Sequence, residues 1–177
     1  MKDIIVLVPA RSGSKRVKDK NIRLLANKPL IEYTINYAKS LNLIKETYII
    51  TDSTHYEEIA ISLGCKSLGI RPRDTARATS ADIEWIQWAI ERIGKIDKDQ
   101  LIVILRPTNP FRTKRMVTDA ISILSSTKAD SVRGVELCKQ HPLKMWAVSS
   151  EKDIIKPYTQ YYIKGQPAHS CQYASLP

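Results

Sequence analysis

The chain has 177 residues, 43% of them hydrophobic and 26% charged, which is typical of one soluble globular domain with an apolar core. Its formal net charge of +10 fits nucleic acid, an anionic membrane surface or a small polyanion as partner. The charge forms no basic tail, because the chain has no run of about five like charges.

No apolar stretch approaches the roughly 18 residues of a membrane span, and the sequence does not open with a signal peptide. We therefore expect no membrane partner. Cys65, Cys138 and Cys171 are widely spaced and include no C-x-x-C pair, which argues against a disulfide framework or a zinc site. Together these features favour a cytoplasmic protein.

Short apolar runs alternate with amphipathic stretches, which favours an α/β fold with a mostly parallel sheet flanked by helices. The apolar runs predict strands over residues 4–8, 47–51, 66–68 and 101–105. Helical spacing predicts helices over residues 29–43, 53–63, 80–93 and 113–125. Asp52 is interpreted as an N-cap with only a secondary role in a site, and His55 as a surface residue. Trp85, Trp88 and Trp146 are expected to serve as core or interface residues, with base-stacking platforms as the alternative.

The pattern changes in the last part of the chain. Residues 131–137 and 145–148 are typical of strands, whereas residues 156–177 carry four Tyr and three Pro with little periodicity. We therefore predict a nucleotide-binding α/β core over residues 1–135 and a partial dimerisation or substrate flap over residues 136–177.

A ligand site is expected at one edge of the sheet, since open parallel sheets bind ligands outside the carboxyl ends of their strands. Residues 10–21, 52–53, 69–80 and 106–112 lie there and are rich in polar, Gly, Pro and Arg residues. Six cations are concentrated within the first stretch and just beyond it: Arg11, Lys15, Arg16, Lys18, Lys20 and Arg23. They indicate a phosphate pocket, with a solvated basic face as the alternative.

The loop over residues 9–16 (PARSGSKR) combines small residues, hydroxyls and cations after a buried strand. Small residues let backbone N–H groups approach phosphate oxygens, and cations neutralise their charge. The loop matches neither the Walker pattern nor G-x-G-x-x-G, so by general motif rules it is only suggestive.

Several motifs in order along nearly the whole chain carry a more specific resemblance. They are Pro9-Ala10-Arg11-x-Gly13-Ser14-Lys15-Arg16-Val17, Lys20-Asn21-Ile22, Lys28-Pro29-Leu30-Ile31, Thr51-Asp52-Ser53, Arg71-Pro72, residues 106–112 (RPTNPFR) and His141-Pro142-Leu143-Lys144. This series resembles the acylneuraminate cytidylyltransferases, which are the CMP-sialic acid synthetases and their legionaminic and pseudaminic acid relatives. The resemblance implies a Rossmann-like nucleotide-diphospho-sugar transferase fold.

The resemblance also implies a reaction. The anomeric hydroxyl of a nonulosonic acid attacks the α-phosphorus of CTP and releases pyrophosphate, with Mg²⁺ as cofactor in a homodimeric enzyme. Arg11 and Lys20 would act in catalysis on the triphosphate, Asn21 would contact the nucleoside and Arg71 the cytosine. The implied nucleotide-binding residues are Ala10, Arg11, Ser12, Gly13, Ser14, Lys15, Lys20, Asn21, Arg71 and Ser80. The implied sugar-binding residues are Arg106, Thr108, Asn109, Arg112 and Lys144.

Departures from the family pattern leave alternatives open. The family usually has an Asp near Ala78, and the acids nearby here are Asp74 and Asp82. The branch for the eight-carbon sugar KDO has an acidic Gly-Asp-Glu-Pro turn where Arg106 stands, which argues against KDO. An Asn-Gly strand and a paired-Asp metal motif would follow Pro177 in the family, so the chain is interpreted as a fragment or a natural truncation, with weak CTP binding and poor turnover.

Other functions are a nucleotidyltransferase for another sugar, or a catalytically silent nucleotide-binding or dimerisation module. Nucleic-acid binding rests on charge alone, because no recognition motif is visible, and it is not expected.

Overall fold

The computed structural model describes residues 4–14, 16–77, 79–94, 96, 100–135, 146–148 and 155–157. The chain divides into two compact units, Met1–Asp130 and Ser131–Pro177. The roles predicted for an α/β core over residues 1–135 and a flap over residues 136–177 stay predictions.

A parallel sheet of four strands forms the centre of the first unit. Its order is β5-β4-β1-β6, so β1 lies between two neighbours. The strands are β1 (Ile4–Pro9), β4 (Ile44–Ile50), β5 (Lys66–Ser67) and β6 (Leu101–Ile104). The predicted α/β fold with a parallel sheet is confirmed.

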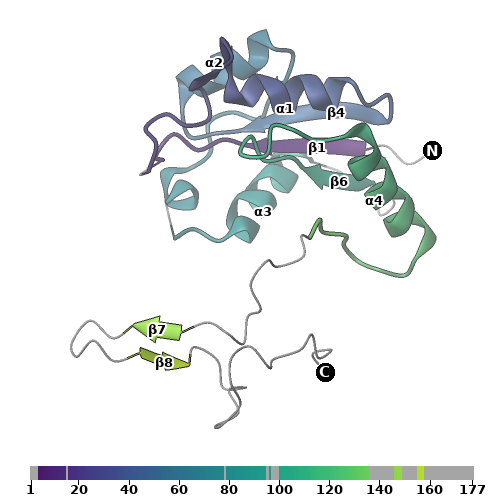
Figure 1. The fold of residues 1–177 in the computed structure, drawn as a ribbon. Helices are drawn as coiled ribbons and strands as arrows, with labels where there is room; N and C mark the ends of the chain where they lie inside the picture. Colours follow the sequence, from purple (N-terminus) through teal and green to yellow (C-terminus); the bar gives the residue numbers. More distant parts are fainter. Residues whose placement is uncertain are drawn as a thin grey trace. The chain divides into compact units, whose positions relative to one another are not determined.

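Helices cover both faces of this sheet (Figure 1). On one face, Val6 and Val8 of β1 share a buried core with α1 (Leu30–Lys39) and α2 (Thr54–Ser62). On the other, Ile5 and Leu7 pack with Trp85 and Ala89 of α3 (Asp82–Ile93). Alternate residues of β1 serve opposite cores because successive side chains of a strand point to opposite faces.

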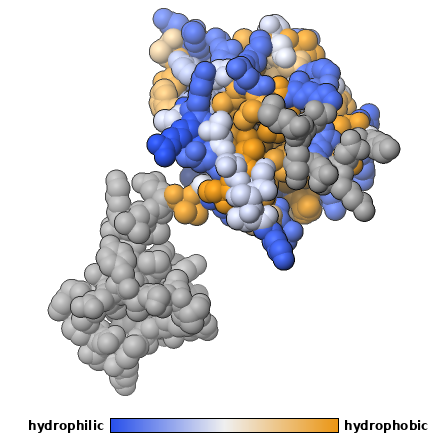
Figure 2. Space-filling model, turned by 90° about the vertical axis from the view of Figure 1, so that its right-hand side faces the viewer, coloured by the Kyte–Doolittle hydropathy of each residue, from blue (hydrophilic) through white to orange (hydrophobic). Residues whose placement is uncertain are grey.

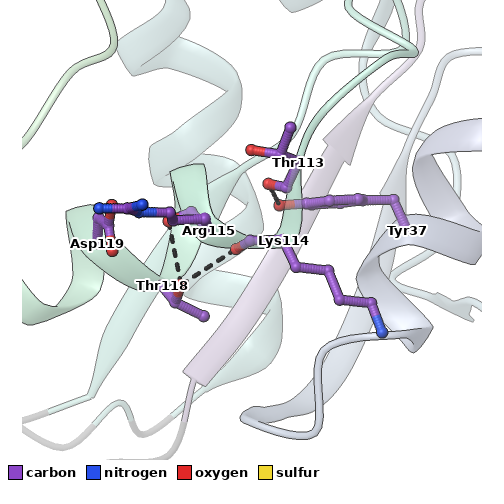
Figure 3. Close-up of polar contacts among 6 residues, drawn as sticks. All are labelled: Tyr37, Thr113, Lys114, Arg115, Thr118 and Asp119. Carbon is purple, nitrogen blue, oxygen red and sulfur yellow. Dashed lines mark hydrogen bonds and ion pairs between the residues drawn. The ribbon is translucent and has the colours of Figure 1, made fainter.

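The helix α4 (Lys114–Ser126) packs less completely. Tyr37 Oη donates a hydrogen bond of 2.8 Å to the carbonyl of Thr113, which joins α1 to the start of α4 (Figure 3). Val117 contacts the core, but none of the residues of α4 is fully buried. Met116 and Ile123 are 53% and 51% exposed. Apolar surface gathers on the side of the first unit that Figure 2 presents.

Short elements depart from the sequence-based prediction. The hairpin β2 (Leu24–Leu25) and β3 (Lys28–Pro29) turns through Ala26 and Asn27, which have φ of 47° and 65°. Two left-handed residues match the right-handed twist of the strands they join. The 3₁₀ turn η1 (Arg73–Ala76) was also not predicted.

In the second unit, β7 (Trp146–Val148) and β8 (Ile155–Pro157) form an antiparallel pair. The strand expected over residues 145–148 is thus present, whereas β8 was not predicted. The expected strand over residues 131–137 is wrong for residues 131–135, which form no strand. Gly134 interrupts this short run and Val135 is 91% exposed, so the segment has no sheet face to bury.

Buried aromatic residues follow the prediction. Trp85 is 3% exposed and Trp88 is partly buried against the same core, while His55 is exposed. In the part of the chain that the structure describes, each helix is too short or too polar to span a bilayer.

Glu46 on β4 makes stability depend on pH. Its carboxylate accepts hydrogen bonds from Lys66 Nζ and Tyr48 Oη, and these bonds lower the pKa of Glu46. Because the folded pKa lies below the unfolded one, the stabilisation is present above about pH 4 and is lost as the pH falls through the folded pKa. We expect Glu46→Gln to melt at a lower temperature than the wild type at pH 7. The difference should shrink on acidification toward about pH 3.

Thermal unfolding followed by circular dichroism between pH 7 and 3 checks this. Glu58→Gln removes an exposed carboxylate from α2 and is the matched control, for which we expect the same melting temperature as the wild type throughout. A difference for Glu46→Gln that stays constant over the whole range would contradict the assignment.

Candidate functional site

A cavity of about 250 Å³ lies where β1 and β6 end at their carboxyl edge. Its walls come from the loop after β1, the segment after β5, the start of α3 and the turn after β6. The lining residues are Pro9, Arg11, Ser14, Lys20, Asn21, Arg71, Thr75, Arg77, Ser80, Asp82, Trp85, Arg106, Pro107 and Thr108. This is the edge at which the parallel sheet predicts a ligand site.

Positive charge dominates the cavity. Among the described residues that line it, the cations are Arg11, Lys20, Arg71, Arg77 and Arg106, and the carboxylate is Asp82. Cations converging in a cleft with low-dielectric walls concentrate anions there. The cavity is thus suited to a polyanion of small size.

Arg71 is the most unusual of these cations, because its side chain is only 3% exposed. Its backbone N–H donates to the carbonyl of Thr51 at 2.9 Å, but its Nε atom is buried without a hydrogen-bond partner in the described part of the chain. Burial lowers the pKa of Arg71, and Arg11 lowers it further, whereas Asp52 and Asp82 favour the charged form. A buried donor without an acceptor is costly, so this guanidinium fits a ligand that supplies one.

The basic loop, residues 10–21, is fixed at its ends by hydrogen bonds. Asn21 is 5% exposed and its Nδ2 donates to the carbonyl of Arg11 at 3.0 Å, while its own carbonyl accepts from the N–H of Ile31 at 2.7 Å. Tyr56 Oη of α2 donates to Asp19 Oδ1 at 3.0 Å. These contacts hold Arg11 and Lys20 against the cavity.

Asp52 contacts Ser12, near the start of the basic loop, and does not cap a helix. Its Oδ1 accepts the Ser12 N–H at 2.8 Å, and its Oδ2 accepts the Ser12 hydroxyl at 2.9 Å. The N-cap of α2 is Ser53, whose Oγ accepts the N–H of Tyr56 at 3.4 Å. The interpretation of Asp52 as the N-cap is therefore wrong, because its carboxylate is committed to the neighbouring strand's loop.

Arg106 is held from two directions. Its Nη2 forms an ion pair with Asp82 Oδ2, while Asp82 Oδ1 accepts Trp85 Nε1–H at 3.0 Å. Arg112 Nη2 donates to the carbonyl of Arg106 at 2.6 Å.

Arg112 is itself occupied by the protein. Its Nη1 donates to Thr34 Oγ1 at 3.3 Å, and its guanidinium lies 6.0 Å from the ring centre of Tyr37. Burial lowers the pKa of Arg112. The side chain therefore braces the turn after β6 instead of pointing into the cavity.

The structure brings many predicted site residues together, although their roles stay predictions. Those that line the cavity are Arg11, Ser14, Lys20, Asn21, Arg71, Ser80, Arg106 and Thr108. Those described but not lining it are Ala10, Ser12, Gly13, Asn109 and Arg112. Lys15 and Lys144 lie outside the described residues.

Thr75 and Arg77 fall in the segment 69–80 that is expected at this edge, although the sequence assigns them no role, and Asp82 and Trp85 were not assigned to the site. The sequence could have placed Asp82 and Trp85 together, because residues three positions apart share a face of a helix, here α3. Arg77 is placed by the turn in which its N–H donates to Ser80 Oγ at 3.1 Å.

The described residues alone do not fit a magnesium site. In that part of the chain, groups of three or more His, Cys, Asp or Glu side chains that could hold a metal ion do not occur. Asp82, the carboxylate at the cavity, already carries an ion pair with Arg106. Mg²⁺ prefers several oxygen ligands, whereas the described lining residues offer mainly cations.

Two solved proteins, a synthetase and a synthase, have this fold. A solved CMP:2-keto-3-deoxy-manno-octonic acid synthetase in complex with CTP superposes with a TM-score of 0.61 at 18% identity, over 72% of this chain and 49% of that one. At that identity the likeness supports the fold alone. A 4-diphosphocytidyl-2C-methyl-D-erythritol synthase superposes with a TM-score of 0.55 at 10% identity, over 71% of this chain and 56% of that one.

Similarity in sequence is closer. The CMP-N,N'-diacetyllegionaminic acid synthase of Legionella pneumophila is 32% identical over 155 residues, which are 87% of this chain and 66% of that protein. The N-acylneuraminate cytidylyltransferase of Escherichia coli is 34% identical over 120 residues, 68% of this chain and 28% of that protein. The chain therefore spans less than two thirds of the length of either relative. The sequence profile described as Cytidylyltransferase matches residues 5–171, and the chain belongs to that family.

Proposed function

We propose that the cavity binds CTP and that the protein transfers CMP to the anomeric hydroxyl of a nonulosonic, sialic-acid-like sugar. The observation that carries the proposal is the buried Nε of Arg71, which has no hydrogen-bond partner among the described residues and lies among converging cations at the carboxyl edge of the sheet. The relatives named as legionaminic acid synthase and N-acylneuraminate cytidylyltransferase support the choice of nucleotide and of sugar.

The chain's own groups account for the transfer by alignment and charge neutralisation. Arg11 and Lys20 approach the cavity from the basic loop, where they would offset charge on the triphosphate and on the departing pyrophosphate. The sugar oxygen forms a bond to the α-phosphorus, the bond from that phosphorus to the β-phosphate oxygen breaks, and the hydroxyl proton leaves to solvent. Holding both reactants in line makes the step effectively unimolecular.

Arg106 supplies the preference for an acidic sugar. Its side chain is 50% exposed and is paired with Asp82 across the cavity wall. A guanidinium can bind a carboxylate through two parallel hydrogen bonds, so the acid group of the sugar would compete for this cation. We further propose that Mg²⁺ enters with the CTP phosphates, and that the protein is a cytoplasmic homodimer.

A second candidate function is a silent nucleotide-binding module. The observation that favours it is the poor fit of the described residues to a metal site. Such a module would bind CTP without releasing pyrophosphate.

Nucleotide titrations and a pyrophosphate-release assay with the purified protein separate these functions. We expect CTP to bind at least about tenfold more tightly than UTP, GTP or ATP, a difference of about 1.4 kcal/mol. With Mg²⁺ and CTP, we expect sialic, legionaminic or pseudaminic acid to release pyrophosphate and KDO to release little. Equal affinity for the four nucleotides would contradict the proposal. CTP binding without release by any acid would favour the silent module.

A further inference from the structure

Asp52 stands at the carboxyl end of β4, the strand beside β1, and reaches across to the loop that follows β1. Both of its carboxylate oxygens are engaged by the same residue, through the Ser12 N–H at 2.8 Å and the Ser12 hydroxyl at 2.9 Å. Ser12 thus directs its two donors at the protein. In this conformation its N–H is not available to a phosphate, unlike the role that the family resemblance implies for it.

The neighbours of Ser12 show what this contact positions. Arg11 and Ser14 line the cavity on either side of it, whereas Ser12 does not. The N–H of Ser14 donates to the carbonyl of Ser12 at 2.8 Å, so the turn that presents Ser14 starts from the residue that Asp52 holds. Asn21 ties the end of the basic loop to Arg11, Asp19 joins the loop to α2, and Asp52 fixes Ser12 near the start of the loop.

We infer that Asp52 is a positioning residue that holds the basic loop open for the nucleotide phosphates before they arrive. The identity of the ligand rests on the proposed function. Charge-assisted hydrogen bonds to both donors of one loop residue restrain that residue strongly. A loop that is ordered in advance loses less conformational freedom when a ligand binds. The contact between Asp52 and Ser12, called the latch from here on, therefore strengthens phosphate binding without contacting phosphate.

Hydrogen exchange of the free protein tests the latch without any nucleotide. We expect Asp52→Ala to increase amide exchange in the peptide over residues 10–23 about tenfold, with peptides of β1 and α1 unchanged. Glu58→Ala removes a carboxylate from the exposed side of α2 and is the matched control, for which we expect the wild-type exchange rate. Unchanged exchange in Asp52→Ala would overturn the inference.

Nucleotide binding gives a second readout that a general loss of stability would not produce. We expect Asp52→Ala to weaken CTP about tenfold and to leave cytidine within about twofold, because only the phosphates need the loop. Ser12→Ala should lose less CTP affinity than Asp52→Ala, because it keeps the hydrogen bond from the backbone N–H of residue 12 to Asp52. The double variant should lose less than the product of the two single effects, because both act through one contact. Asp52→Asn keeps an acceptor for the N–H and should recover part of the affinity.

The two readouts separate the inference from the proposed function. A wild type that binds CTP no better than other nucleotides would remove the proposed function, while faster loop exchange in Asp52→Ala would still support the latch. Equal weakening of CTP and cytidine, or additive effects of Ser12→Ala and Asp52→Ala, would overturn it.

Discussion

In an Arg71→Met variant, CTP affinity is expected to fall about 100-fold while the melting temperature rises. The fall follows from removing a buried guanidinium whose Nε has no acceptor among the described residues until a ligand provides one. Hydrogen bonds to a charged group contribute about 1.5–3 kcal/mol, which corresponds to about 10–150-fold in affinity.

The rise follows from the same burial. A cation that is 3% exposed and close to Arg11 destabilises the ligand-free protein, and burial lowers its pKa for that reason. Met fills comparable volume with no charge to bury. We expect about 1 kcal/mol of stabilisation, or a few degrees in melting temperature.

Calorimetric titration with CTP and a thermal melt without it measure the two effects. Arg71→Lys keeps the charge but loses the planar fork, so it should lose affinity without gaining stability. Arg73→Met removes an exposed cation from η1 and should leave both quantities unchanged. Arg71→Met that melts well below the wild type would show that the guanidinium is a structural residue.

The main layers of the fold could be predicted from the sequence because each depends on a periodic pattern. The uninterrupted apolar run of β1 predicts a strand buried on both faces, and its neighbours are indeed α1 and α3 on opposite sides. The hairpin β2–β3 and strand β8 have only two or three residues each, too few to display a period. These short strands form because they pair with a partner strand, and no local sequence pattern indicates which segments pair.

In the candidate site, too, residues in local motifs could be predicted, whereas contacts between distant segments could not. Arg11, Lys20 and Arg71 could be assigned because they belong to local motifs after strands. The contacts of Asp52 with Ser12 and of Asp82 with Arg106 join residues 40 and 24 positions apart. They depend on which strands are neighbours, and the order β5-β4-β1-β6 was not predicted. Asp52 was therefore read from its local surroundings as an N-cap.

The last prediction concerns the charge of the basic loop. Arg11 and Lys20 both line the cavity, and Arg11 Nη1 donates to the carbonyl of Ala76 at 3.4 Å, which directs it across the site. We expect the double variant Arg11→Gln, Lys20→Gln to bind CTP at least about 100-fold more weakly, on the basis of about 1.5–3 kcal/mol for each of the two charged contacts. Cytidine affinity should stay within about twofold.

Arg16 and Lys18 provide a control of equal charge in the same loop, because both are exposed and neither lines the cavity. If the phosphates are bound by direct contact, Arg16→Gln, Lys18→Gln should lose no more than about threefold in CTP affinity, and that loss should vanish at high salt. If the loop acts only through its overall charge, the two double variants should weaken CTP equally. Titrations with CTP, CMP and cytidine at about 50 and 300 mM salt distinguish the cases, since direct contacts in a partly buried cavity are screened much less than exposed charges.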